Sequence, residues 1–211
     1  MKLIVKISKY LFAFAVLSAF VLTGCIKADT DLDYGFPLIY MPQATVTQIN
    51  NYYTIPRGPI EEYSTYNCYY ENGKLNIVLG VSRAGKIANT KGFSVTLSVA
   101  QAETASAVAA MNEAGGVEAM VLPNVYTLPS SITVEAGKNS GAVYMSVDMN
   151  ALAQIDDIVV DNQWKRLVLA VEISNPTEYE LSDTNTSVVI IIDLNSSFWN
   201  WGTPPNLVFT K

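Results

Sequence analysis

Apolar side chains recur at every second position through much of this chain, and this alternation most limits what the chain can fold into. Successive side chains of an extended strand point to opposite faces, so a period of two predicts strands with one buried face. The pattern runs through 75–81, 93–99, 143–147 and 167–173, with a shorter example at Ile132 and Val134. These segments are separated by clusters of Gly, Pro, Asn and Ser, which are typical of turns.

Two segments depart from this alternation. Residues 188–192 are apolar at every position, which predicts a central strand covered on both faces. Residues 103–114 are rich in alanine and end at Gly115-Gly116, which predicts a connecting helix with glycine stops. A second short helical turn is expected near 150–154.

The segment Glu135–Gly141 has the composition of a turn, and it predicts a hairpin between the strand at 132–134 and the return strand at 143–147. In total we expect at least seven strands. The predicted fold is all-β, an immunoglobulin-like β-sandwich with one short connecting helix, spanning residues 37–194.

The N-terminus has the features of a secretory signal. Lys2, Lys6 and Lys9 precede an uncharged run, Leu11–Leu22. That run is shorter than the roughly 20 residues that a membrane-spanning helix needs, and it fits the apolar core of a signal peptide. The alternative is a buried helix that happens to end in Gly-Cys.

Directly after the run, Leu22-Thr23-Gly24-Cys25 resembles the lipobox of bacterial lipoproteins. We therefore expect residues 1–24 to be a signal peptide and Cys25 to be lipid-modified, which would anchor the protein to a membrane.

Residues 25–36 then form a polar tether that contains Asp29, Asp31 and Asp33. Acidic residues at this position resemble the export signal of Bacteroidota-type lipoproteins. The resemblance implies an outer-membrane location facing the cell exterior, although a plain solvated linker fits the same residues.

Charge and composition exclude several classes of function. Removing the three signal lysines from thirteen Lys and Arg leaves ten against nineteen acidic residues, a formal charge of −9. This acidity argues against nucleic acid as a partner. The chain has no histidine, which excludes a Ser-His-Asp triad and His-ligated metal sites. Without a phosphate-binding glycine loop or a dinucleotide fingerprint, no cofactor is expected.

The sequence still allows catalysis by carboxylates, for which a pair of acidic residues is the minimum in glycoside hydrolysis. The available pairs are Glu61/Glu62, Asp156/Asp157 and Glu178/Glu180. Neighbouring acids in sequence are usually solvated, and the acidic loop 156–161 lacks EF-hand spacing. We therefore expect neither an enzyme nor a metal protein. With Cys25 lipidated, Cys68 has no partner and is expected to be a small buried strand residue.

Aromatic residues supply the candidate ligand contacts, because sugar rings stack on aromatic faces while fixed polar groups meet their hydroxyls. Six tyrosines fall between 50 and 70, and we take Tyr52, Tyr53, Tyr63 and Tyr66 as candidates. The aromatic-rich C-terminal tail, 195–211, adds Trp199 and Trp201, and Trp164 is expected in a loop. The alternatives are that the tyrosines pack in the sandwich, and that the tail covers a sheet edge or docks on a partner protein.

Several pieces of the stretch from Leu75 to Asp193 occur together in one known family. They are the Val81–Gly85 turn, the FSVTLSV strand, Met111–Glu113, LPNVYTLP at 122–129, the turn at 134–138, and LVLAVEIS followed by Pro176 and Tyr179. In order and spacing the stretch resembles domain of unknown function 1735. Family members often have a proline in the strand where this chain has Leu169-Ala170-Val171, and the module usually precedes a second domain, whereas here only SSFWNWGTPPNLVFTK follows.

This resemblance implies an outer-surface lipoprotein of a bacterial glycan-utilisation locus, and it supplies no catalytic residues. The sequence therefore predicts a non-catalytic cell-surface lipoprotein that binds a polysaccharide or oligosaccharide, or that assists its capture beside an outer-membrane transporter or other surface lipoproteins. A structural or assembly protein, such as a fimbria-like subunit or a transporter partner, is the alternative.

Overall fold

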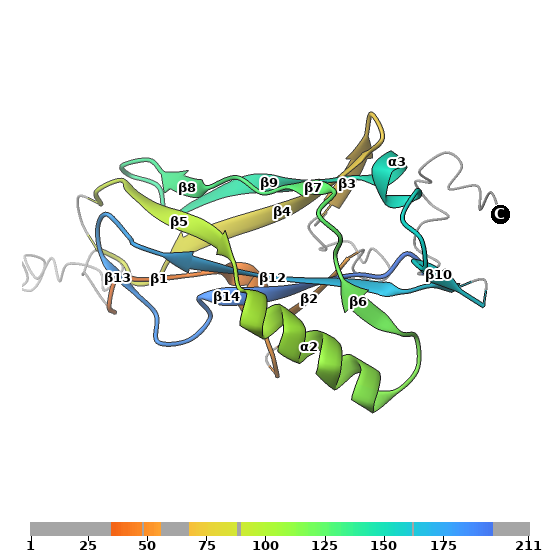
Figure 1. Cartoon of the computed structure of the whole chain (residues 1–211). Helices are drawn as coiled ribbons and strands as arrows, with labels where there is room; N and C mark the ends of the chain where they lie inside the picture. Colours follow the sequence, from red (N-terminus) through yellow and green to blue (C-terminus); the bar gives the residue numbers. More distant parts are fainter. Residues whose placement is uncertain (1–34, 48, 56–67, 88–89, 162, 196–211) are drawn as a thin grey trace, which may run out of the picture. The chain divides into compact units, whose positions relative to one another are not determined.

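The alternating segments form two layers of β-sheet in the computed structural model, which describes residues 35–47, 49–55, 68–87, 90–161 and 163–195 (Figure 1). All of these residues belong to one unit, Gly35–Lys211. The predicted all-β sandwich is confirmed.

The first sheet has the order β13-β1-β4-β9-β7, and β3 also pairs with β4. Its longest strands, β4 and β9, run antiparallel from Lys74↔Asp148 to Ser82↔Ser140. The bounds are β1 Leu38–Tyr40, β3 Cys68–Glu71, β4 Lys74–Arg83, β7 Tyr126–Thr127, β9 Ser140–Asp148 and β13 Glu180–Leu181.

The second sheet has the order β2-β14-β12-β5-β8, and β6 also pairs with β12. Its bounds are β2 Tyr52–Ile55, β5 Phe93–Val99, β6 Ala119–Val121, β8 Ser131–Val134, β12 Arg166–Ser174 and β14 Ser187–Ile192. The N-terminal part of the unit contributes to both sheets: β1 pairs with β4, and β2 runs parallel to β14.

Shorter elements complete the described part of the chain. A two-stranded ribbon joins β10 to β11, and two α-helices and a 3-10 helix lie between strands. Their bounds are β10 Val159–Val160, β11 Gln163–Trp164, α2 Gln101–Ala114, α3 Met149–Leu152 and η2 Pro42–Thr45. Both helices predicted from the sequence are present, and Gly115 ends α2 with a φ of +80°, a region that glycine adopts without steric cost.

The main core lies between the sheets, where the period-two residues meet. In β4 all four inward residues of the pattern are fully buried, namely Leu75, Ile77, Leu79 and Val81. The facing residues come from β12 and β14, and include Leu167, Leu169, Val188 and Ile190. The alternation is thus explained by burial of one face of each sheet against the other.

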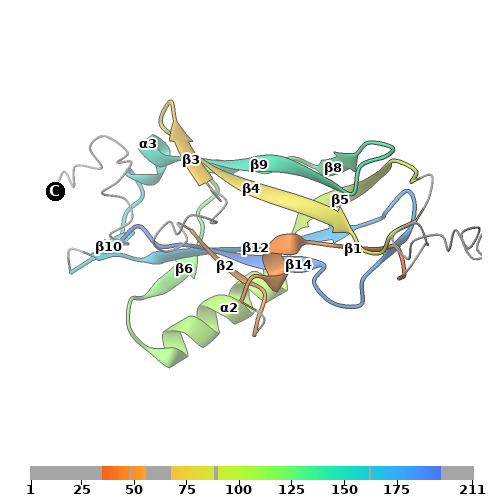
Figure 2. The ribbon, with the colours of Figure 1, turned by 180° about the vertical axis from the view of Figure 1, so that it is seen from behind.

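A second, smaller core explains the fully apolar strand. The outward side chains of β14 and β12 pack under α2, in a cluster of Ala107, Ala119, Val168, Ala170, Val189 and Ile191. Figures 1 and 2 show α2 lying against the β12–β14 layer, on the side away from β4 and β9. The prediction that 188–192 is a central strand covered on both faces is confirmed.

Thr104 on α2 also completes the hydrogen bonding of β12. Its hydroxyl accepts a bond from the Ala170 N–H at 2.8 Å and donates one to the Ala100 carbonyl at 2.9 Å. Ala170 lies between the stretch of β12 paired with β5 and the stretch paired with β6. A helix side chain therefore fills the gap between two neighbouring strands.

Two expectations from the sequence were wrong. The predicted hairpin across 135–141 does not form, because β8 pairs with β5 in the second sheet while β9 pairs with β4 in the first. The turn is a crossover between layers. Trp164 lies in strand β11 rather than in a loop, and its backbone is held by Asn195, whose side chain bonds the Trp164 N–H at 2.9 Å and its carbonyl at 2.6 Å.

Candidate functional site

The two outer faces of the sandwich differ in what covers them. Helix α2 packs on the second sheet, where the outward side chains of Val168, Ala170, Val189 and Ile191 on β12 and β14 are buried. In the described part of the chain, the first sheet instead leaves Tyr69, Thr127, Ala142 and Tyr144 exposed. We call the outward side of β3, β4, β9 and β7 the open face.

Two tyrosines meet on the open face. Tyr69 of β3 is 44% exposed and Tyr144 of β9 is 49% exposed. Their ring centroids lie 5.2 Å apart with planes at 80°, an edge-to-face contact. Strand β4 runs between β3 and β9, with Asn76 opposite Tyr69 and Val78 opposite Tyr144, so the pair bridges β4.

Polar side chains continue this arrangement across the sheet. Tyr69, Asn76, Ser146 and Thr127 are successive cross-strand neighbours on β3, β4, β9 and β7. The Ser146 hydroxyl donates to the side-chain oxygen Oδ1 of Asn76 at 2.6 Å, which fixes the buried side-chain amide. With strands about 4.8 Å apart, this row spans roughly 14 Å. Exposed rings beside hydroxyl groups are the chemistry that contacts sugars.

The aromatic candidates named from the sequence lie elsewhere or outside the described residues. Tyr53 is 3% exposed and Trp164 is 6% exposed, and both pack in the main core. Tyr52 points to the other face of β2 and packs against the cluster under α2. These positions agree with the packing alternative. Four further candidates lie outside the described residues, as does the lipidation site: Tyr63, Tyr66, Trp199, Trp201 and Cys25.

Sequence reasoning missed Tyr144, although its signal was present. The pattern on this segment places Val143, Met145 and Val147 inward, so the alternation alone requires Tyr144 to point outward. Tyr69 carries no such signal, because apolar Cys68 and Tyr70 flank it in a run of aromatic residues. In the structure both flanking residues pack against the core, which leaves Tyr69 on the open face.

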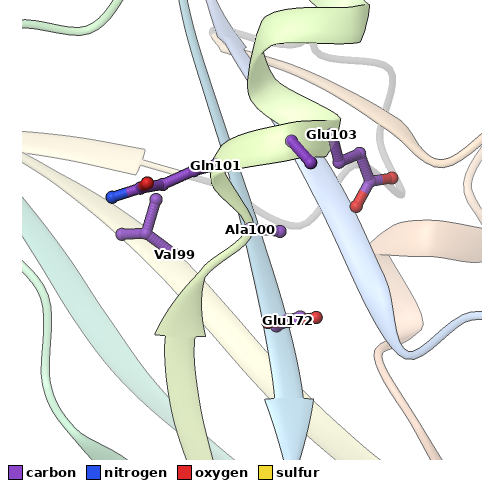
Figure 3. A pocket seen from close by; sticks show the side chains of 6 residues that line it. Val99, Ala100, Gln101, Glu103 and Glu172 are labelled. Atoms are coloured by element: carbon purple, nitrogen blue, oxygen red, sulfur yellow. The ribbon is translucent and has the colours of Figure 1, made fainter.

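A cavity of about 370 Å³ opens at the start of α2, between the end of β5 and Glu172 of β12 (Figure 3). Glu103 and Gln101 project to opposite sides of the helix start. The Glu103 carboxylate accepts hydrogen bonds from Asn51 at 2.7 Å and Ser187 at 3.1 Å, so it ties α2 to β14. The lining contains no aromatic ring: Val99, Ala100, Gln101, Ala102, Glu103 and Glu172. The cavity therefore offers nothing on which a sugar ring could stack.

The acidic pairs proposed from the sequence do not gather. Glu178 forms an ion pair with Lys91 at 3.2 Å, while Asp156 and Asp157 lie on an exposed turn. Glu61/Glu62 fall outside the described residues. Within the described ranges, no group of three or more acidic or cysteine side chains is placed to hold a metal ion.

At one end of the sandwich, the buried Arg83 and Phe93 meet the half-buried Tyr179 and the exposed Asn139, and we call these four residues the end cluster. The guanidinium of Arg83 lies 5.4 Å from the Tyr179 ring centre, and Phe93 contacts that ring edge-to-face at 5.7 Å. Arg83 donates to Asn139 and to the Ala84 and Gly85 carbonyls, but its buried Nε has no partner in the described structure. Arg83 is only 5% exposed, which argues for a structural role.

The sequence motifs on which the family resemblance rests also have structural roles in the described part of the chain. Residues 81–85 include Arg83, the last residue of β4, and the 134–138 turn leads directly to Asn139. Tyr179 is itself part of the end cluster. Asn112 hydrogen-bonds both the N–H and the carbonyl of Ala119 in β6. The 122–129 segment leaves the second sheet at Leu122, which bonds Val168, and joins the first at β7. The open-face tyrosines lie outside these motifs.

Cys68 lies on β3, as expected for a strand cysteine, and its side chain packs against the core. It is a free cysteine. Burial raises the pKa of its thiol to about 11, because a thiolate loses more hydration there than a thiol does. Near neutral pH the group is protonated and therefore a poor nucleophile.

Comparisons with known proteins add structural neighbours of low identity. No family model matches the chain, and no curated protein matches it. Among solved structures, a candidate carbohydrate-binding protein from Bacteroides ovatus is 12% identical, with a TM-score of 0.44 over 74% of this chain and 37% of that one. An auxiliary nutrient-binding protein from Bacteroides thetaiotaomicron is 16% identical, with a TM-score of 0.43 over 68% and 44%.

A third neighbour is a multidomain protein from Bacteroides ovatus that includes domain of unknown function 1735. It is 13% identical, with a TM-score of 0.42 over 67% of this chain and 39% of that one. This chain spans less than half the length of each of the three structures. Separately, none of the helices in the described ranges is long and apolar enough to cross a membrane.

Proposed function

We propose that this protein is a non-catalytic cell-surface lipoprotein that binds glycan on the open face of its first sheet. The observation that carries the proposal is the exposed Tyr69–Tyr144 pair beside the hydroxyl groups of Ser146 and Thr127. A tyrosine ring presents an apolar face to the C–H groups of a sugar, and its phenol provides a hydrogen bond at the edge.

The position of the site also suits capture of a polymer. In the described part of the first sheet the row runs from β3 to β7, each of which pairs with a single strand. A long chain that lies along the row therefore needs no free terminus. In the described part of the second sheet, α2 covers outward side chains of β12 and β14, and the outward side chains of β5 and β8 are Ser and Thr without an aromatic ring. The cavity at the start of α2 is lined by two carboxylates and no ring, which suits a sugar less well.

The surface location is supported by the sequence. The charged start, the apolar run and the lipobox-like Leu22–Cys25 together favour lipidation at Cys25. The acidic tether after Cys25, and the resemblance to domain of unknown function 1735, favour the outer face of the outer membrane. On this proposal the sandwich is held away from the membrane by residues 25–36.

Affinity electrophoresis tests the binding. The chain from Lys27 to Lys211, which keeps the whole unit Gly35–Lys211, would be run through gels that contain plant and host polysaccharides. We expect one or more polysaccharides to retard it, and Tyr144→Ala to weaken the retardation. Phe36→Ala is the matched control, because Phe36 is 80% exposed and precedes β1. Strand β1 pairs with β4 at Ser82 and Arg83, whereas Tyr69 lies opposite Asn76, near the other end of β4. Absence of retardation by every glycan would contradict the proposal and favour an assembly role.

A further inference from the structure

We infer that the open face selects a neutral, single glycan chain over an anionic glycan or the flat surface of a crystalline polysaccharide. The inference rests on the proposed glycan binding and specifies its ligand class. It follows from two separate observations, which are the angle between the tyrosine rings and the charges that surround them.

The ring geometry excludes a flat ligand. The planes of Tyr69 and Tyr144 meet at 80°, so the two rings cannot both lie parallel to one surface. A crystalline polysaccharide presents many sugar faces in one plane, and a platform for it needs ring faces that are parallel and level. Here one ring can stack on a sugar face while the other meets the same ligand with its edge and hydroxyl.

A single chain satisfies this geometry. Rotation about its glycosidic bonds lets neighbouring sugars turn relative to one another, so one unit can lie on a ring face and the next can reach hydroxyl groups along the row. Ser146 and Thr127 continue the row from the tyrosines towards β7. The row of roughly 14 Å, three strand spacings, therefore contacts a short stretch of one chain.

The charges beside the pair disfavour an anionic ligand. One pairing row runs from Glu71 through Lys74 to Asp148, two residues along β3, β4 and β9 from the Tyr69 row. Lys74 is thus the only cation of that row and has an acid on each side. The row thus has one positive and two negative side chains, a formal charge of −1, whereas sites for carboxylate or sulfate groups ordinarily have an excess of Arg or Lys.

Asp148 is also committed to a structural role. Its side chain accepts hydrogen bonds from the Asn150 N–H at 3.0 Å and the Ala151 N–H at 2.9 Å, which cap α3. The carboxylate is therefore held at the start of α3, in the strand position directly opposite Lys74. The formal charge without the three signal lysines, ten Lys and Arg against nineteen acids or −9, adds repulsion for an anionic polymer at low salt.

The test compares three kinds of ligand with the same protein, Lys27–Lys211. Gels would contain soluble neutral polysaccharides (a mixed-linkage β-glucan, a galactomannan and an arabinoxylan) or soluble anionic ones (polygalacturonate and chondroitin sulfate). Sedimentation with crystalline cellulose would test the flat surface. We expect retardation by at least one neutral polysaccharide, none by the anionic ones, and no sedimentation.

Amino-acid substitutions test whether the observed binding takes place on the open face. Tyr69→Ala and Tyr144→Ala should each weaken binding of the neutral glycan about tenfold, and Phe36→Ala should not change it. Binding should also persist at about 1 M salt, where the screening length is ~3 Å. Far-UV circular dichroism of each variant would show that the sheets remain folded.

The outcomes separate this inference from the proposed function. Tyrosine-dependent binding to an anionic polysaccharide or to crystalline cellulose would overturn the ligand class and leave glycan binding standing. Binding to a neutral glycan that neither tyrosine variant weakens would overturn the site. No binding to any of the three kinds of ligand would overturn the proposed function, and this inference with it.

Discussion

Replacing Tyr179 by leucine should destabilise the sandwich strongly, because this one side chain makes three kinds of contact in the end cluster. Its hydroxyl accepts a hydrogen bond from the Lys91 N–H at 2.8 Å and donates to the Lys91 carbonyl at 3.2 Å. Its ring receives the edge of Phe93 and the guanidinium of Arg83.

The magnitude follows from these contacts. The two hydrogen bonds contribute about 0.5–1.5 kcal/mol each, the ring pair about 0.5–1.5 kcal/mol and the cation–π contact about 0.5–2 kcal/mol. Because Tyr179 is half-buried and water can replace part of what is lost, we expect Tyr179→Leu to cost about 3 kcal/mol. Tyr179→Phe keeps the ring contacts and should cost about 1 kcal/mol. The φ of +66° at this residue affects both variants alike.

Urea unfolding of Lys27–Lys211, followed by far-UV circular dichroism, would measure both differences in the free energy of unfolding. The comparison requires an unchanged slope with denaturant, so that the midpoint reports stability. Phe36→Leu, at an 80% exposed position, should stay within about 0.5 kcal/mol of the parent. If Tyr179→Leu were as mild as this control, the end cluster would not stabilise the sandwich as we argue.

Four further results are expected. Leu79→Ala should cost about 2–5 kcal/mol in urea unfolding, because Leu79 is fully buried. Thr104→Val should cost about 1–3 kcal/mol by leaving the Ala170 N–H unpaired, whereas Ser106→Ala on the exposed side of α2 should be near neutral. Alkylation of Cys68 at pH 8 should be about a hundredfold slower in the folded than in the urea-unfolded chain, since burial raises the pKa of its thiol from 9.0 to about 11. Because the thiol of the unfolded chain ionises at the lower pH, the free energy of unfolding should fall as the pH rises from about 9 to about 11. Cys25→Ser should abolish incorporation of labelled palmitate in cells, and continued labelling would contradict lipidation at that residue.

Much of the fold could be predicted from local pattern. Period-two alternation identified β4, β5, β9 and β12 with the correct inward residues, and the fully apolar run identified β14 as central. The glycines after Ala114 predicted the end of α2. These features depend on residues close together in the sequence, so their signals are local.

Pairing between segments that are distant in the sequence could not be predicted from the local pattern. The composition of 135–141 indicates a turn but does not say whether the next strand returns to the same sheet, and here it crosses to the other one. Trp164 has polar neighbours, which suggest a loop, yet contacts from distant parts of the chain bury it. Hydrophobic burial is decided by the tertiary partner, which a single local pattern does not reveal.

In the candidate site, too, one feature could be predicted from the local pattern and others depend on tertiary contacts. Alternation in β9 was sufficient to place Tyr144 outward, whereas the position of Tyr69 depended on which neighbours reached the core. Which outer face stays open depends on where α2 packs, and this is a tertiary property. The aromatic richness of 50–70 therefore indicated the right kind of side chain but not the residues that share a surface.

The most direct test of the central claim is affinity electrophoresis of three proteins in one gel that contains a polysaccharide bound by the parent chain. The proteins are the parent Lys27–Lys211, the double variant Tyr69→Ala/Tyr144→Ala, and Phe36→Ala. We predict that the parent and Phe36→Ala are retarded equally, and that the double variant migrates as it does without glycan. Equal retardation of the double variant and the parent would contradict the assignment of the open face as the binding site.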